Sequence, residues 1–107
     1  MAKLINEKPA NEYFEESKEW LVGSRFIVTV YYNNLNCSIF IDDKSNLLKS
    51  LALTPKLGKD LGLFDEPDVK LSPSIDTCSI TVPSHKYGHI FKLIENYLIM
   101  LEENAKN

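Results

Sequence analysis

The residues of this 107-residue chain whose types could do metal chemistry are two histidines and two cysteines. His85 and His89 are four positions apart, a spacing at which two helical histidines can share a zinc ion, with cysteines as further ligands. On a helical wheel, however, both histidines lie opposite the apolar stripe of their segment. Cys37 and Cys78 instead share the phase of the aliphatic residues in their strands. The four side chains are therefore expected to point into different environments, and we predict no metal site.

The same phase argument applies to nucleophilic catalysis, which requires a nucleophile and a base within hydrogen-bond reach. Cys37 and Cys78 each alternate with apolar residues, a setting that raises the pKa of a thiol and makes it less reactive. Two widely spaced cysteines are also too few for a disulfide framework. We predict free, reduced thiols and no catalytic residue.

Other candidate motifs lack the required spacing. The segment 57–62 contains two glycines and a lysine but not the G-x₄-G-K-[ST] order of a phosphate-binding loop. The acidic clusters lack the D-x-D-x-D-G alternation of a calcium loop, and we interpret them as solvated turns: Asp42, Asp43, Asp65, Glu66 and Asp68. The sequence therefore predicts no cofactor.

Helical periodicity is the first signal for the elements that would position any site. One apolar stripe, in a segment with Asn11 as N-cap and Gly23 at its end, predicts an amphipathic helix. The stripe consists of Ala10, Tyr13, Phe14, Ser17, Trp20 and Leu21. A second such stripe, from Tyr87 to Leu101, predicts a helix of four turns.

Strand signals lie between these two segments. Residues 25–32 and 37–42 are rich in β-branched and aromatic residues, and the asparagine-rich connection between them predicts a hairpin. A short helix is expected over Leu47 to Leu53, stopped by Pro55, with a further turn to Gly62. Residues 69–71 and the alternating run 75–82 predict two more strands.

These elements predict one α+β domain over residues 1–107, with a small, mainly antiparallel sheet, helices largely to one side and the order α-β-β-α-β-β-α. Residues 1–8 are expected to form a flexible N-terminal segment. The element order resembles that of the secretion chaperones that bind effector segments. Small toxin-immunity proteins and phage-encoded inhibitors share this general character.

Charge and hydropathy bear on the class of partner. The formal net charge is −3, and eleven lysines accompany the single arginine, Arg25, which disfavours a nucleic-acid partner. No run approaches the roughly 20 apolar residues that span a bilayer, and the N-terminus lacks the apolar region of a signal peptide. We therefore expect a cytoplasmic protein without a membrane partner.

The sequence holds more apolar side chains than one small domain is expected to cover. We predict a non-enzymatic protein-binding module of the inhibitor, immunity, chaperone or adaptor type, which binds another protein or forms a dimer with a second copy. The predicted contact residues form an apolar patch, Ile27, Tyr31, Phe40, Leu93 and Met100, and an acidic rim, Glu12, Glu15, Glu16 and Glu19. Two alternatives stay open, namely an undetected small-molecule or enzymatic pocket and RNA binding by the sheet face.

Overall fold

The computed structural model of the chain describes residues 1–12 and 15–105, and it is an α+β fold. The strands are β1 (Ala2–Lys8), β2 (Glu16–Val22), β3 (Phe26–Tyr32), β4 (Asn36–Asp43), β5 (Lys70–Pro73) and β6 (Cys78–Pro83). The helices are α1 (Ser50–Asp60) and α2 (Tyr87–Ala105), with short 3₁₀ turns η1 (Leu63–Asp65) and η2 (Ser84–Lys86).

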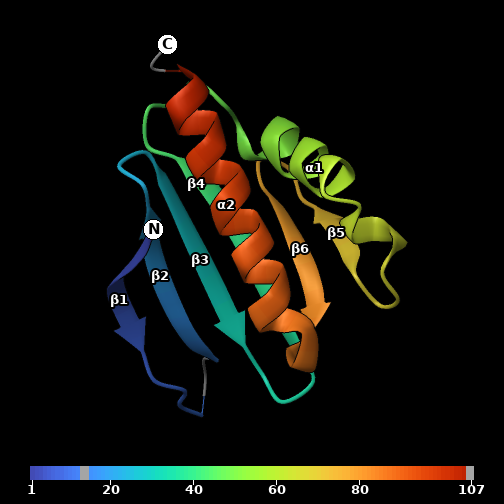
Figure 1. Cartoon of the computed structure of the whole chain (residues 1–107). Helices are drawn as coiled ribbons and strands as arrows, with labels where there is room; N and C mark the ends of the chain where they lie inside the picture. The colour runs from blue at the N-terminus through green and yellow to red at the C-terminus, as the bar shows by residue number, and fades with distance from the viewer. Residues whose placement is uncertain (13–14, 106–107) are drawn as a thin grey trace.

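The strands form one six-stranded sheet in the order β1-β2-β3-β4-β6-β5, and every neighbouring pair is antiparallel. Both helices lie on the same side of this sheet, with α2 running across its middle strands and α1 beside it (Figure 1). A hydrogen bond of 2.6 Å from the Tyr97 hydroxyl to Asp60 Oδ2 joins the two helices. Among residues 1–12 and 15–105, no helix lies on the other side of the sheet.

The predicted first helix is wrong, and the observed element order is β-β-β-β-α-β-β-α. Residues 16–22 form strand β2, which pairs along its whole length with β3. Because side chains alternate along a strand, Trp20 and Leu21 lie on opposite sides of the sheet. Trp20 packs against Phe91 of α2, with ring centroids 5.5 Å apart. Tertiary pairing thus overrides the helical periodicity. Tyr13 and Phe14, assigned to the same helix, lie outside the described residues.

Residues 1–8, for which the sequence predicts a flexible segment, contribute the edge strand β1. Its pairing with β2 shifts register between Leu4 and Asn6, so a bulge interrupts the strand. Gly23, with φ of 64°, makes the tight β2–β3 turn, and its N–H bonds to the Met1 carbonyl at 3.2 Å. The buried Glu95 of α2 accepts a 2.8 Å hydrogen bond from the backbone of Ala2.

The helix α1 is one continuous helix with Pro55 inside it, so the predicted stop before Pro55 is wrong. Proline has no N–H, so the Leu51 carbonyl, four residues earlier, lacks its usual helical hydrogen bond. Leu51 lies on the exposed side of the helix, where water can bond to this carbonyl instead. The predicted final helix is confirmed as α2. The predicted 25–32 and 37–42 hairpin is confirmed as β3 and β4.

One core fills the space between the helices and the sheet. Its strand residues alternate along β3, β4 and β6, so that every second side chain faces the helices. The fully buried large side chains include Phe26, Val28, Val30, Ile39, Ile41, Leu57, Ile80, Ile90, Ile94 and Leu98.

Candidate functional site

The side of the sheet that faces away from the helices, here called the open face, carries an apolar stripe. The stripe crosses three neighbouring strands and consists of Leu21, Ile27, Phe40 and Tyr31. Leu21 pairs with Ile27 across β2 and β3, while the rings of Tyr31 and Phe40 meet edge to face with centroids 5.6 Å apart. Tyr31 is 42% exposed, and the other three are half-buried by their neighbours on the sheet. The structure thus brings together Ile27, Tyr31 and Phe40, as the sequence predicts.

A hollow of about 700 Å³ lies on the open face beside Tyr31. Pro9, Asn11 and Glu15 lie on one side of this sheet hollow, and strands β2 and β3 lie below it. Its lining includes Lys8, Glu15, Ser17, Glu19, Thr29 and Tyr31. Ser17 is only 8% exposed and pairs directly with Tyr31 across the strands. The volume lies within the roughly 300 to 1,000 Å³ of small-ligand sites.

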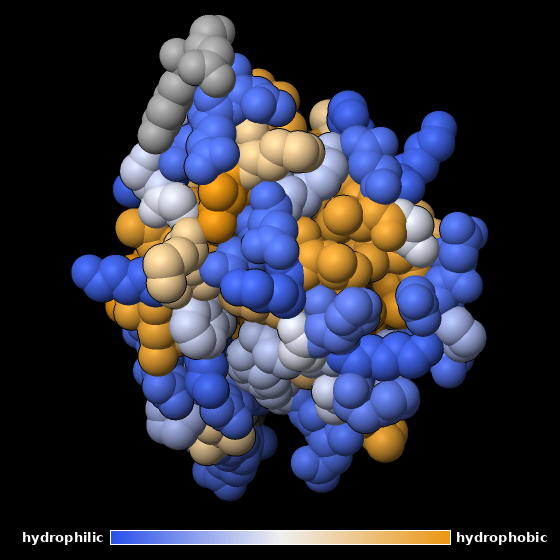
Figure 2. Space-filling model, viewed as in Figure 1, coloured by the Kyte–Doolittle hydropathy of each residue, from blue (hydrophilic) through white to orange (hydrophobic). Residues whose placement is uncertain are grey.

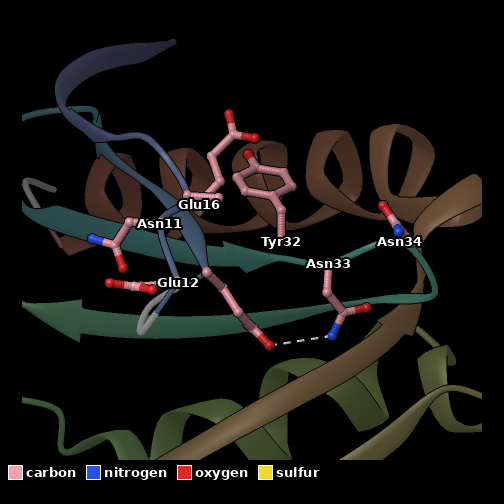
Figure 3. A pocket seen from close by; sticks show the side chains of 8 residues that line it. Asn11, Glu12, Glu16, Tyr32, Asn33 and Asn34 are labelled. Atoms are coloured by element: carbon pink, nitrogen blue, oxygen red, sulfur yellow. Dashed lines mark hydrogen bonds between the residues drawn. The ribbon is translucent and has the colours of Figure 1, made fainter.

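A second, more open hollow of about 460 Å³ lies at the same end of the sheet, and we call it the acidic pocket. It is lined by Asn11, Glu12, Glu15, Glu16, Tyr32 and Asn33, among others, and Figure 3 shows these side chains around it. The dashed line in Figure 3 is the 3.3 Å hydrogen bond that Asn33 Nδ2 donates to Glu15 Oε1. Lys18 Nζ lies 3.9 Å from Glu16 Oε1 and 5.4 Å from the Tyr32 ring centroid, so this pocket holds part of its own counter-charge.

The four predicted rim glutamates gather at one end of the molecule but do not form a single ridge. Glu16 pairs with Tyr32 on the helix side of the sheet, whereas Glu19 pairs with Thr29 on the open face. Glu12 and Glu15 precede β2, and Glu15 lines both hollows. The helical spacing that suggested a ridge does not hold for Glu16 and Glu19, because residues 16–22 form a strand.

Leu93 and Met100, the other two predicted contact residues, lie on α2 and therefore on the opposite side of the sheet from Tyr31. Met100 is 48% exposed, and Leu93 packs partly against the core. Figure 2 shows hydrophilic side chains over the middle of α2, with apolar ones on either side. The apolar surface of the helix side is thus divided, and the structure does not join it to the open face.

The histidines and cysteines do not meet in one site. His85 in η2 and His89 in the first turn of α2 are exposed, while Cys37 and Cys78 are 2% and 0% exposed. Burial raises the pKa of both thiols, although the Ser84 hydroxyl, 3.8 Å from Cys37 Sγ, lowers that of Cys37 slightly. Within residues 1–12 and 15–105, no cluster of three or more such ligands could hold a metal ion.

Asp43 corrects the prediction that the Asp42-Asp43 pair is a solvated turn. Asp42 is exposed, but the Asp43 side chain is fully buried and receives two hydrogen bonds from Arg25. It also accepts bonds from Ser45 and from the backbone of Leu48. The pKa of Asp43 lies well below its ordinary value, first because of the Arg25 bonds and then because of those from Ser45 and Leu48.

Sequence reasoning missed Ser17, Thr29 and Lys8 as lining residues of the sheet hollow. A usable signal was present in the alternation of Ser17, Glu19 and Leu21 with Lys18, Trp20 and Val22. Gly23-Ser24 directly after this alternation is typical of a turn between two strands.

The fold and the open face define this chain as an α+β protein with one side of an antiparallel sheet uncovered in the described residues. Comparison of the chain with protein-family models, with curated proteins and with solved structures gave no match. None of the helices in the described part of the chain has the length and apolar character needed to cross a membrane.

Proposed function

We propose that this chain is a non-enzymatic protein-binding module whose contact surface is the open face of its sheet. The observation that carries the proposal is the apolar stripe with Tyr31 at its exposed end. Antiparallel sheets commonly leave one face to water, but such a face is then polar. Here the stripe breaks that pattern on three adjacent strands, where a partner can cover it.

The composition of the face suits a protein partner. Tyrosine and phenylalanine are enriched in the centres of protein interfaces, because their rings bury large areas at a small cost in side-chain entropy. Polar side chains flank the stripe, including Ser17 and Ser38 opposite Tyr31 on the two neighbouring strands, and Asp42 opposite Ile27. This arrangement supports an apolar centre with a polar rim, which is the usual anatomy of an interface.

Charge supports a different protein as the partner in preference to a second copy. The chain carries a net charge of −3, so two copies repel each other, and Glu15 and Glu19 lie beside the exposed end of the stripe. A partner with basic residues next to an apolar segment complements this surface. An inhibitor, immunity, chaperone or adaptor protein of the cytoplasm acts through such contacts.

The test compares two double variants that remove similar amounts of apolar surface. A photo-crosslinker at position 31 first identifies the partner, and the complex is then reconstituted from the two purified proteins. Tyr31→Ser with Phe40→Ser should weaken binding at least about tenfold, because aromatic anchors contribute most of the energy of an interface. Leu47→Ser with Phe64→Ser, in the β4–α1 connection and in η1, removes exposed apolar side chains outside the open face and is the control.

Equal loss of binding in both double variants would contradict the proposal, as would a stable dimer of the purified chain that buries position 31. Urea denaturation of each variant separates a lost contact from a lost fold, and Tyr31→Ser alone offers a milder change because that side chain is already 42% exposed.

Binding of single-stranded RNA is a second candidate, favoured by the neighbouring Tyr31 and Phe40 rings. The glutamates at the rim oppose phosphate, which supplies most of the affinity for RNA. Salt-sensitive retention of the purified chain on RNA at low ionic strength, lost in Tyr31→Ser, would support this candidate over a protein partner.

A further inference from the structure

Two carboxylates and one lysine line the sheet hollow, so its lining carries a net negative charge. Glu15 and Glu19 line it, and in the described part of the chain neither carboxylate lies within 4.0 Å of a basic group. Glu19 Oε1 accepts a 3.0 Å hydrogen bond from Asn6, and Glu15 Oε1 accepts one from Asn33. Each carboxylate therefore keeps its other oxygen available to an external donor.

Hydroxyl groups on the floor of the hollow are also available. Ser17 is only 8% exposed, and its side chain makes no hydrogen bond to another described residue. Thr29 and Tyr31, which line the same hollow, likewise make no side-chain hydrogen bond within the described chain. The Ser17 oxygen is not fully buried and lines the hollow, so it can accept a hydrogen bond from a ligand that enters there.

The wall of the hollow is aromatic. Tyr31 stands at the junction between the hollow and the apolar stripe, and its ring is partly exposed beside Glu15 and Glu19. An aromatic face next to carboxylates is the environment that a guanidinium group prefers, because the flat group stacks on the ring while its N–H groups bond to the carboxylates.

We propose that the sheet hollow receives an arginine side chain from an extended segment of the partner protein, an inference that rests on the proposed function above. The guanidinium bonds to Glu15 and Glu19 and to the hydroxyl of Ser17, and its plane stacks on Tyr31. The residues next to the arginine in that segment then lie over Phe40 and Ile27. The hollow is large enough for one such side chain with its flanking backbone.

Lys8 is the basic residue in the lining, and its removal should change arginine binding in the opposite direction to the removal of a glutamate. Its ammonium opposes a cationic ligand, so Lys8→Gln should strengthen arginine binding, whereas Glu19→Gln should weaken it. Glu66→Gln changes the net charge by the same amount as Glu19→Gln. Glu66 lies between η1 and β5 along the chain, and it is the matched control because β5 is the edge strand opposite β1 (Figure 1).

The probe is N-acetyl-arginine methylamide, titrated into the full chain and followed by the shifts of backbone amide signals in NMR spectra. We expect saturable shifts at Ser17, Glu19, Thr29 and Tyr31, with a dissociation constant in the millimolar range for one side chain. The neutral isostere, the citrulline derivative, should bind about tenfold more weakly, and Glu19→Gln should weaken the arginine probe by a similar factor.

Equal shifts with arginine and citrulline, or equal effects of Glu19→Gln and Glu66→Gln, would overturn the assignment of arginine. If the probe fails while the partner complex still requires Tyr31 and Phe40, the arginine inference is wrong and the docking face stands. If the complex does not require those rings either, both proposals are wrong.

Discussion

Arg25 and Asp43 form a two-point ion pair across the β3–β4 hairpin. Arg25 Nε donates to Asp43 Oδ1 at 2.9 Å, and Nη2 donates to Oδ2 at 2.8 Å. The Asp43 carboxylate also accepts the N–H of Leu48 at 2.9 Å, so it holds the connection between β4 and α1. This pair fixes the end of the sheet far from the sheet hollow, which makes it a test of the fold separate from the site.

Asp43→Asn should destabilise the protein by about 3 to 5 kcal/mol, because it leaves the Arg25 guanidinium partly buried without its counter-charge. Asp42→Asn, at the adjacent exposed position, should change stability by less than about 0.5 kcal/mol. Urea denaturation at pH 7 measures both. Equal stabilities of the two variants would show that the pair does not hold the hairpin.

The same carboxylate predicts an acid-sensitive part of the stability. The folded state lowers the pKa of Asp43, so its stabilising contribution is complete above the unfolded pKa of about 3.9 and is lost as the pH falls further, through the folded pKa. The difference in unfolding free energy between the natural chain and Asp43→Asn should therefore be constant from pH 7 to about 5 and shrink below about pH 4. A difference that grows on acidification contradicts this sign.

Two glycines should respond to alanine in opposite directions. Gly23 has φ of 64°, and a Cβ there would lie 2.7 Å from Glu102 Oε2, a carboxylate whose other oxygen accepts the 2.9 Å bond from the Ser24 N–H. Gly23→Ala should cost at least about 1 to 2 kcal/mol. Gly88, near the start of α2, has no atom within 4 Å of such a Cβ, so Gly88→Ala should be neutral or stabilise by up to about 1 kcal/mol. Thermal and urea unfolding compare the pair.

Both thiols should be protected from reagents in the folded state. Cys37 and Cys78 are almost fully buried, and burial raises the pKa of each, which lowers the fraction of reactive thiolate. Titration with a disulfide reagent at pH 8 should therefore detect two thiols in urea. In buffer without urea the reaction should be slow, because it is limited by unfolding or local opening of the protein. Rapid reaction of one thiol in buffer would show an accessible cysteine.

The sequence correctly predicts the elements whose hydrophobic pattern fits only one type of secondary structure. In β3, Phe26, Val28 and Val30 alternate among β-branched and aromatic residues, and in α2 the 3.6-residue stripe extends over many turns. The segment before Gly23 satisfies two patterns, because Ser17, Trp20 and Leu21 share a helical face while Trp20 and Val22 share a strand face. Pairing with β3, a long-range effect, decides between them.

The candidate site was predicted in part for the same reason. Tyr31 and Phe40 belong to strands that the sequence identifies correctly, so their meeting on one face follows from the hairpin. The sheet hollow is lined by Lys8 of β1, by Glu15 and by residues of β2, and a helix in place of β2 would not form this hollow. Leu93 and Met100 could not be assigned to a side of the sheet without the tertiary arrangement.

Carbene footprinting of the chain, alone and in the reconstituted complex with its partner, tests the central claim most directly. We expect labelling of Tyr31 in the free chain, strong protection of Tyr31 and Phe40 in the complex, and unchanged labelling of Phe64 and Met100 on the helix side. Protection of Phe64 and Met100 with undiminished labelling of Tyr31 would contradict the account, because the contact surface would then lie on the helices.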